Sequence, residues 1–183
     1  MSRHFITIED LSRGDLAATM TYDPVFGTTT SATHIAAVEI DPQTYEVRID
    51  RFTVAEDCGK LVNPLIVDGQ VHGGVAQGIG AALYEEVVYD AEGQIMTASL
   101  VDYLVPSASE IPSMQVVHLD SASPTTLGGF RGMGEGGTIG APAAIANAIA
   151  DALLPLGVMI DELPVTPERL FRLVQAASGK AKT

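Results

Sequence analysis

The sequence predicts an α+β domain, and three observations support this. Hydrophobic residues make up 46% of the 183-residue chain and the mean hydropathy is +0.24, so the chain carries enough apolar surface to fold despite its acidity. Strand patterns and helix patterns both occur, and they do not alternate strictly along the chain. The length fits one domain, or two small lobes that share a core.

The first elements that the pattern predicts are a β-hairpin and a long helix. Apolar alternation over 33–40 and 46–54 is typical of two strands, and the turn-forming segment 41–45 joins them. Pro64 favours the start of a helix over 65–88, in which apolar residues recur every four or five positions. Glycines interrupt this helix at a cost of about 1 kcal/mol each relative to alanine, so we expect one helix face to lie against backbone or a cofactor. These glycines are Gly73, Gly74, Gly78 and Gly80.

The second half of the chain predicts further strands and two helices. The expected strands cover 94–103, 114–119 and 158–161. A helix should begin at Pro142 and end at Pro155, because proline cannot continue a helix. A last helix is expected up to Ala177, with Thr166 as its N-terminal cap. Mixed sheet hairpins packed on glycine-rich helices are the architecture that we expect.

The composition excludes several classes of partner. With 10 Lys+Arg against 23 Asp+Glu the formal charge is −13, and such a surface repels nucleic acid and anionic membrane surfaces. The longest apolar stretch, 141–160, contains two prolines and an aspartate, so we expect no membrane span. The first residues lack the apolar region of a signal peptide, and Cys58 is the single cysteine. We therefore expect a reducing, cytoplasmic location.

A glycine-rich loop over 127–140 is the first candidate site. Residues 132–137 match G-x-G-x-x-G, and Asp151 follows. A dinucleotide fingerprint requires a buried strand before the loop, which 123–129 does not provide, so a surface loop before a helix is the favoured interpretation. Free amides and a helix N-terminus nevertheless form a cradle for an anion, and Glu135 lies within it. A carboxylate there keeps its charge, which favours a general base.

Other candidates have simpler interpretations. Cys58 has no second cysteine and no histidine at a spacing that places it nearby, so a small buried or loop residue is expected. His72 is interpreted as a packing or surface residue, and Gln70 and Gln77 as solvated amides. The adjacent carboxylates 85–86 point in different directions on a helix, so they do not form an acid/base pair. Spacing alone leaves the function undecided.

Three segments in this order are specific enough to indicate a family. They are D-C-G-K-L-V-N-P over 57–64, G-Q-V-H-G-G-V-A-Q-G-I-G-A-A-L-Y-E-E over 69–86, and G-G-F-R-G-M-G-E-G-G-T-I-G over 128–140. Together they closely resemble the C-terminal part of the molybdenum-binding large subunit of the xanthine oxidase family, nearest to the carbon monoxide dehydrogenase-like and aldehyde or N-heterocycle hydroxylases. The resemblance covers about 33–177, which we expect to be a molybdopterin-binding domain, with an extension or linker over 1–32 and a tail over 178–183.

The resemblance implies a role for particular residues. Glu135 matches the family's catalytic base, which activates the oxygen that attacks an electron-poor carbon of a small-molecule substrate. Gln77 matches a glutamine that approaches the molybdenum ligands or the pterin. The remaining cofactor-binding residues are implied to be Cys58, Gly59, Asn63, Arg131, Gly132, Met133 and Gly134. No residue of this chain is implied to bind the metal directly, and the implied cofactor is molybdopterin with molybdenum, in its cytosine dinucleotide form.

The resemblance also implies partners. Electrons leave the family's molybdenum centre through [2Fe-2S] clusters to FAD, which are held by an iron–sulfur subunit and an FAD subunit. Family large subunits run to several hundred residues, and their N-terminal lobe is absent here. We therefore expect a separately encoded or truncated piece that is active only with a complementary large-subunit chain. The alternative is a non-catalytic scaffold or assembly fragment of the same fold that binds no cofactor.

Overall fold

A mixed β-sheet forms one layer of the protein. The computed structural model describes residue 21 and residues 28–180, and within these residues three strands pair in the order β1-β2-β3. They are β1 (Ser31–Ile40), β2 (Val47–Asp57) and β3 (Met114–His118). β1 and β2 are antiparallel, with a bulge between Ala37 and Val38, whereas β2 and β3 are parallel. The predicted hairpin and the strand near 114–119 are confirmed.

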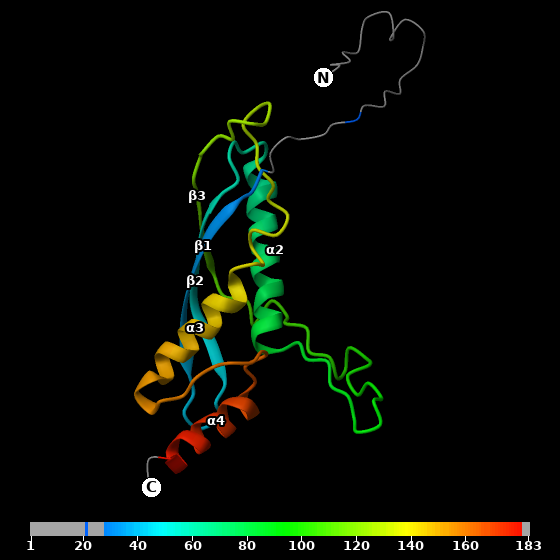
Figure 1. Cartoon of the computed structure of the whole chain (residues 1–183), viewed down its shortest axis with the longest axis vertical. Helices are drawn as coiled ribbons and strands as arrows, with labels where there is room; N and C mark the ends of the chain where they lie inside the picture. Colours follow the sequence, from blue (N-terminus) through cyan, green and yellow to red (C-terminus); the bar gives the residue numbers. More distant parts are fainter. Residues whose placement is uncertain (1–20, 22–27, 181–183) are drawn as a thin grey trace, which may run out of the picture.

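Helices cover the sheet and extend beyond its end. The helical elements of the described residues are α2 (Pro64–Leu83), α3 (Ala141–Leu153), the short 3₁₀ helix η1 (Leu154–Leu156) and α4 (Pro167–Lys180). Figure 1 shows α2 running along the strands, α3 crossing them, and α4 at the far end. Thr166 caps α4 as predicted, because its Oγ1 accepts the N–H of Arg169 at 3.2 Å. The sheet and its helices confirm the α+β class.

The core lies between the sheet and the helices. On β2 the buried side chains alternate with exposed ones, as expected for a strand with one covered face. On α2 and α3 the buried side chains recur every four residues and form one apolar stripe on each helix. Each fully buried aliphatic or aromatic side chain stabilises the folded state by about 1.5–3 kcal/mol relative to an exposed one. The completely or almost completely buried set includes Phe52, Val54, Val71, Val75, Ile79, Ile145, Ile149, Val165 and Leu170.

Three of the predicted elements differ from the structure. The long helix ends at Leu83 rather than at 88. Just after Leu83, the N–H groups of residues 84 and 85 both donate to the Gly80 carbonyl. The expected strand over 94–103 is wrong, because its backbone bonds locally, with the N–H of Tyr103 donating to the Ser99 carbonyl at 2.8 Å. The expected strand over 158–161 is also wrong: Val158 is buried in the core, but the segment has no strand partner in the described chain.

Residues 85–113, which we call the arm, extend away from the sheet and helices after α2 (Figure 1). Many of its large apolar side chains are exposed, and Leu100 and Val101 are 82% and 86% accessible. Contiguous exposed apolar surface marks an interaction site rather than a solvated face. No helix in the described part of the chain is long and apolar enough to span a bilayer.

Candidate functional site

Two loops that are far apart in the sequence pair at one end of the sheet. Gly59 forms a β-bridge with Phe130, and the N–H of Arg131 donates to the Cys58 carbonyl at 2.8 Å. Gly59 has a φ of 70°, and a Cβ at this position would collide with the Gly129 carbonyl, so glycine is required here. The structure therefore brings together Cys58, Gly59 and Arg131, as the sequence motifs imply.

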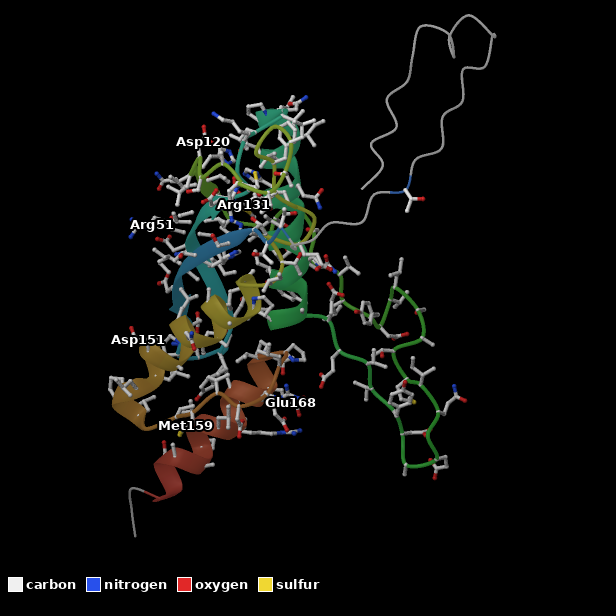
Figure 2. The ribbon with its side chains drawn as sticks, turned by 45° about the horizontal axis from the view of Figure 1, so that its top comes forward. Arg51, Asp120, Arg131, Asp151, Met159 and Glu168 are labelled. Atoms are coloured by element: carbon white, nitrogen blue, oxygen red, sulfur yellow. The ribbon has the colours of Figure 1, made fainter. Side chains whose placement is uncertain are left out.

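The side chain of Arg131 ties neighbouring segments to these loops. Its Nε donates to the Ser121 carbonyl at 3.0 Å and its Nη1 donates to the Thr29 carbonyl at 3.1 Å. Figure 2 shows Arg131 in the upper part of the molecule, among the loops next to α2. Because both contacts are to backbone, the guanidinium fixes the position of the loop as well as placing a positive charge there.

Cys58 is buried, and its surroundings keep it as a thiol. Burial raises the pKa of Cys58 to about 11, and the negative charge of Glu56, whose Oε1 lies 3.8 Å from Sγ, adds to this. A thiol with such a pKa is protonated near pH 7 and is a poor nucleophile or metal ligand. The geometry supports the simple interpretation of Cys58 as a small buried residue beside the loop.

We did not predict from the sequence the cluster that the buried Glu56 forms with the partly exposed His118 and Asp68. Nδ1 of His118 contacts Oε1 of Glu56, and its Nε2 lies 2.8 Å from Oδ1 of Asp68. Glu56 is completely buried, and parallel pairing places it opposite His118. We expected no histidine near Cys58, yet His118 contacts the same carboxylate oxygen. The sequence did carry one indication of this contact: the alternation of apolar and polar residues places Glu56 and His118 on the covered face of their strands.

Burial lowers the pKa of His118, but the hydrogen bonds to Glu56 and Asp68 outweigh it, so that the net shift raises the pKa above 6.5. Both neighbours are carboxylates, which accept hydrogen bonds when ionised, so both ring nitrogens of His118 act as donors. The raised pKa favours the imidazolium form of the ring, which joins β2, β3 and α2 through these two contacts.

Glu135 lies in a turn before α3, over residues 134–139, which we call the Glu135 turn, and its side chain is exposed. Its carbonyl accepts the N–H groups of Thr138 at 2.9 Å and Ile139 at 3.1 Å. We expected Glu135 to lie within the cradle formed by the N-terminus of the following helix, and the structure places it further from that helix. α3 begins at Ala141, and the helix dipole acts only within about one turn.

The carbonyls on both sides of Glu135 are held by side chains from other elements. Nε2 of Gln70, on α2, donates to the Gly134 carbonyl at 2.6 Å. Nε2 of His34, on β1, lies 3.0 Å from the Gly136 carbonyl. Gln70 was expected to be a solvated amide, so this contact is a correction. His34 was not predicted as a site residue, because nothing local connects it with a loop 102 residues away.

Gln77 lies next to the turn that carries Glu135, whereas its implied approach to the pterin or the molybdenum ligands stays a prediction. Oγ1 of Thr138 is 3.1 Å from the Gly74 carbonyl and 3.4 Å from Oε1 of Gln77. The backbones also pack closely here, because a Cβ on Gly74 would lie 2.9 Å from Gly137 backbone atoms. The prediction that one face of the glycine-rich helix lies against backbone is confirmed.

Replacing Gly137 with alanine should separate the Glu135 turn from α2. The added Cβ would lie 2.5 Å from the Val71 carbonyl oxygen and 3.0 Å from the Val71 Cα, both of which belong to a rigid helix. Overpacking of this kind lowers the free energy of unfolding by about 1–3 kcal/mol. Thermal unfolding of the wild type and Gly137→Ala should show a lower midpoint for the variant. Gly179→Ala is the matched control, since a Cβ there meets nothing within 4 Å, and an equal change in both variants would contradict the close approach.

The other predicted cofactor residues fall into two groups. Asn63 and Met133 have contacts within the chain: Oδ1 of Asn63 caps α2 by accepting the N–H of Ile66 at 3.4 Å, and Sδ of Met133 lies 3.9 Å from Oγ1 of Thr30. Gly132 and Gly134 are exposed, and a Cβ on Gly134 would meet no atom within 4 Å. The fold of this chain does not require glycine at 134. A glycine there leaves the backbone open to a group from outside.

These residues form an open surface rather than an enclosed cavity, because Gln77, Gly134 and Glu135 are all exposed. Within residues 28–180, no three His, Cys, Asp or Glu side chains form a group that could hold a metal ion. Chemically, the arrangement offers backbone, one amide side chain and one carboxylate to a ligand that a second surface would have to enclose.

Comparisons with known proteins give the family. Residues 3–112 match the molybdopterin cofactor-binding domain family. The nicotine 6-hydroxylase large subunit of Paenarthrobacter nicotinovorans is 45% identical over 139 residues, which cover 76% of this chain and 17% of that protein. The carbon monoxide dehydrogenase large chain of Hydrogenophaga pseudoflava is 32% identical, covering 86% of this chain and 20% of that protein. Quinoline 2-oxidoreductase from Pseudomonas putida 86 has a TM-score of 0.76 and 50% identity, covering 78% of this chain and 18% of that chain.

The fold and the open, glycine-lined surface define a cofactor-binding α+β domain. The chain belongs to the molybdopterin cofactor-binding domain family, and its resemblance to the molybdenum-binding subunits of the xanthine oxidase family is confirmed. It spans 17–20% of the length of the two relatives described above. The family match begins at residue 3, inside the segment 1–32 that we expected to be an extension or linker, and that boundary stays a prediction.

Proposed function

We propose that this chain is the molybdopterin-binding portion of a molybdenum hydroxylase, an oxidoreductase that oxidises a carbon centre with oxygen derived from water. The substrate class that we infer is an aldehyde, an N-heterocycle or a similar small molecule. The observation that carries the proposal is the exposed carboxylate of Glu135, placed beside open glycine backbone and next to Gln77. A base must be reachable by substrate, and a side chain of this kind meets that requirement.

The residues present fit the cofactor. Open backbone at Gly132 and Gly134 gives room for close approach of the pterin and its phosphates, and the paired loop at Cys58 and Gly59 adds buried, fixed backbone next to it. We assign Gln77, Asn63, Arg131 and Met133 to the same cofactor surface, and we propose the cytosine dinucleotide form. When bound, the cofactor supplies the molybdenum at which the substrate is oxidised by two electrons.

The chain's own contribution to the reaction is positioning and proton transfer. Glu135 acts as the general base and holds the proton on its carboxylate during the oxidation. The turn that carries Glu135 is fixed to α2 by the close approach of Gly74 and Gly137, so the carboxylate is presented from a defined backbone position.

The site needs a second polypeptide surface to be complete. Relatives of this chain are several times longer, and the exposed arm over 85–113 provides an apolar surface that such a partner would cover. We propose a complementary large-subunit chain, together with an iron–sulfur subunit that carries [2Fe-2S] clusters and a subunit that carries FAD. We propose that the assembled enzyme is active in the cytoplasm and that the isolated chain is inactive.

Metal analysis of the purified assembly tests this function. The chain, expressed with its complementary large-subunit chain, should contain about one molybdenum and one pterin per pair. Gly134→Val should lower both contents, because the side chain fills backbone space that we assign to the cofactor, whereas Gly179→Val at the far end should leave them unchanged. A stable, molybdenum-free protein that needs no partner would instead identify the chain as a non-catalytic scaffold.

A further inference from the structure

We propose that His34 and Gln70 are positioning residues that hold the Glu135 turn through the carbonyls of Gly136 and Gly134. This inference rests on the proposed function of Glu135 as the base. The two side chains come from different elements, β1 and α2, and each contacts the carbonyl of a residue directly next to Glu135. The Gly134 carbonyl belongs to the peptide group that precedes Glu135, and the Gly136 carbonyl belongs to the peptide group that follows Gly136, so the backbone is held on each side of Glu135.

The chemistry of the His34 contact defines its tautomer. A carbonyl oxygen can only accept, so Nε2 of His34 must carry the proton and donate it to Gly136. Nδ1 is buried and has no hydrogen-bond partner among the described residues, so adding a proton there would leave a buried donor without an acceptor. Burial lowers the pKa of His34, which agrees with a neutral ring. The surroundings of His34 therefore favour the neutral ring with its proton on Nε2.

The His34 ring is also packed so that it cannot turn away from the loop. Its centroid lies 5.8 Å from that of Phe52, with an interplanar angle of 81°. On the other side, a Cβ on Gly140 would lie 2.5 Å from Cδ2 of the ring, so the ring rests directly on backbone at the start of α3. A histidine that only filled the core would not need Nε2 aimed at a loop carbonyl.

Gln70 provides the matching contact from the helix. It is exposed in the first turns of α2, yet its Nε2 lies at 2.6 Å from the Gly134 carbonyl, a short hydrogen bond. Neither Gly134 nor Gly136 carries a side chain to pack, so hydrogen bonds to their carbonyls are the means by which neighbouring elements can fix this part of the turn. A displacement of about 1 Å at a catalytic group can cost on the order of a hundredfold in rate.

The test uses the assembled enzyme and four variants. His34→Phe keeps a ring but removes the donor, and Gln70→Met keeps the side-chain length but removes the amide. His34→Gln retains a donor at the end of the chain. Gln115→Met replaces an exposed glutamine on β3 whose side chain makes no hydrogen bond to the Glu135 turn, and it serves as the control. Hydrogen exchange of amides 135–139, molybdenum content, kcat and KM are measured for each.

We expect exchange of amides 135–139 to rise about tenfold in His34→Phe and Gln70→Met, and kcat to fall about tenfold or more, with KM and molybdenum content unchanged. His34→Gln should recover a large part of both effects, and Gln115→Met should resemble the wild type. Unchanged exchange, or faster exchange with normal kcat, would overturn the positioning role. Exchange does not depend on turnover, so normal activity in a Glu135→Gln enzyme would instead reject the proposed function and leave the structural contacts standing.

Discussion

Turnover of the assembled enzyme should fall by about a hundred- to ten-thousand-fold when Glu135 is replaced by glutamine. Glutamine has the shape of glutamate but cannot accept a proton near neutral pH, so the variant removes the base alone. The turn should survive, because its contacts with His34, Gln70 and Gly74 are made by backbone atoms of the loop or by Thr138 rather than by the Glu135 side chain.

Steady-state kcat, measured at equal molybdenum content, is the appropriate quantity for this comparison. Glu92→Gln is a matched control, since Glu92 is an exposed carboxylate on the arm and makes no side-chain contact with the Glu135 turn. If Glu135→Gln turned over at close to the wild-type rate with full cofactor content, Glu135 would not be the base. Loss of molybdenum together with loss of activity would point to a defect in assembly.

Local signals in the sequence predicted those elements whose structure depends on nearby residues. The hairpin, the helix that begins at Ala141 and the Thr166 cap are each encoded within a few positions, and all three are present. The strand expected over 94–103 failed because apolar alternation specifies a strand only when a neighbouring strand completes its hydrogen bonds. In this segment local turns satisfy the backbone instead.

In the candidate site too, the features encoded by nearby residues were predictable from the sequence, and the contacts between distant residues were not. The resemblance predicted Glu135, Gln77 and the Cys58 loop as parts of the site, and in the structure Thr138 contacts Gln77 while Arg131 pairs with the Cys58 loop. The contacts of His34 and His118 were not predictable, because they join residues 102 and 62 positions apart. These contacts depend on the parallel pairing of β2 with β3, which the arm separates in the sequence, and on the packing of the Glu135 turn against His34 of β1, and no local pattern encodes either.

Replacing His118 with leucine should lower the free energy of unfolding by about 3–5 kcal/mol, because it leaves the buried carboxylate of Glu56 without its counter-charge. Oε2 of Glu56 is already buried without a partner among the described residues, so little remains to solvate the charge. Urea unfolding of the wild type and the variant near pH 6 measures the difference. His72→Leu is the control, because His72 is an exposed histidine on α2, and its loss should cost far less.

The pH dependence distinguishes this ion pair from simple packing. The pKa of His118 is raised above 6.5 in the folded protein, so the folded state binds a proton more tightly than the unfolded state. The stabilisation is therefore fully present below 6.5 and is lost as the pH rises through the folded pKa. The wild type should lose stability as the pH rises from about 6 to about 9. The difference in free energy of unfolding between the wild type and His118→Leu should therefore narrow over this range. A difference that stays constant would show that the His118 ring stabilises the end of the sheet by packing alone, with no contribution from its charge.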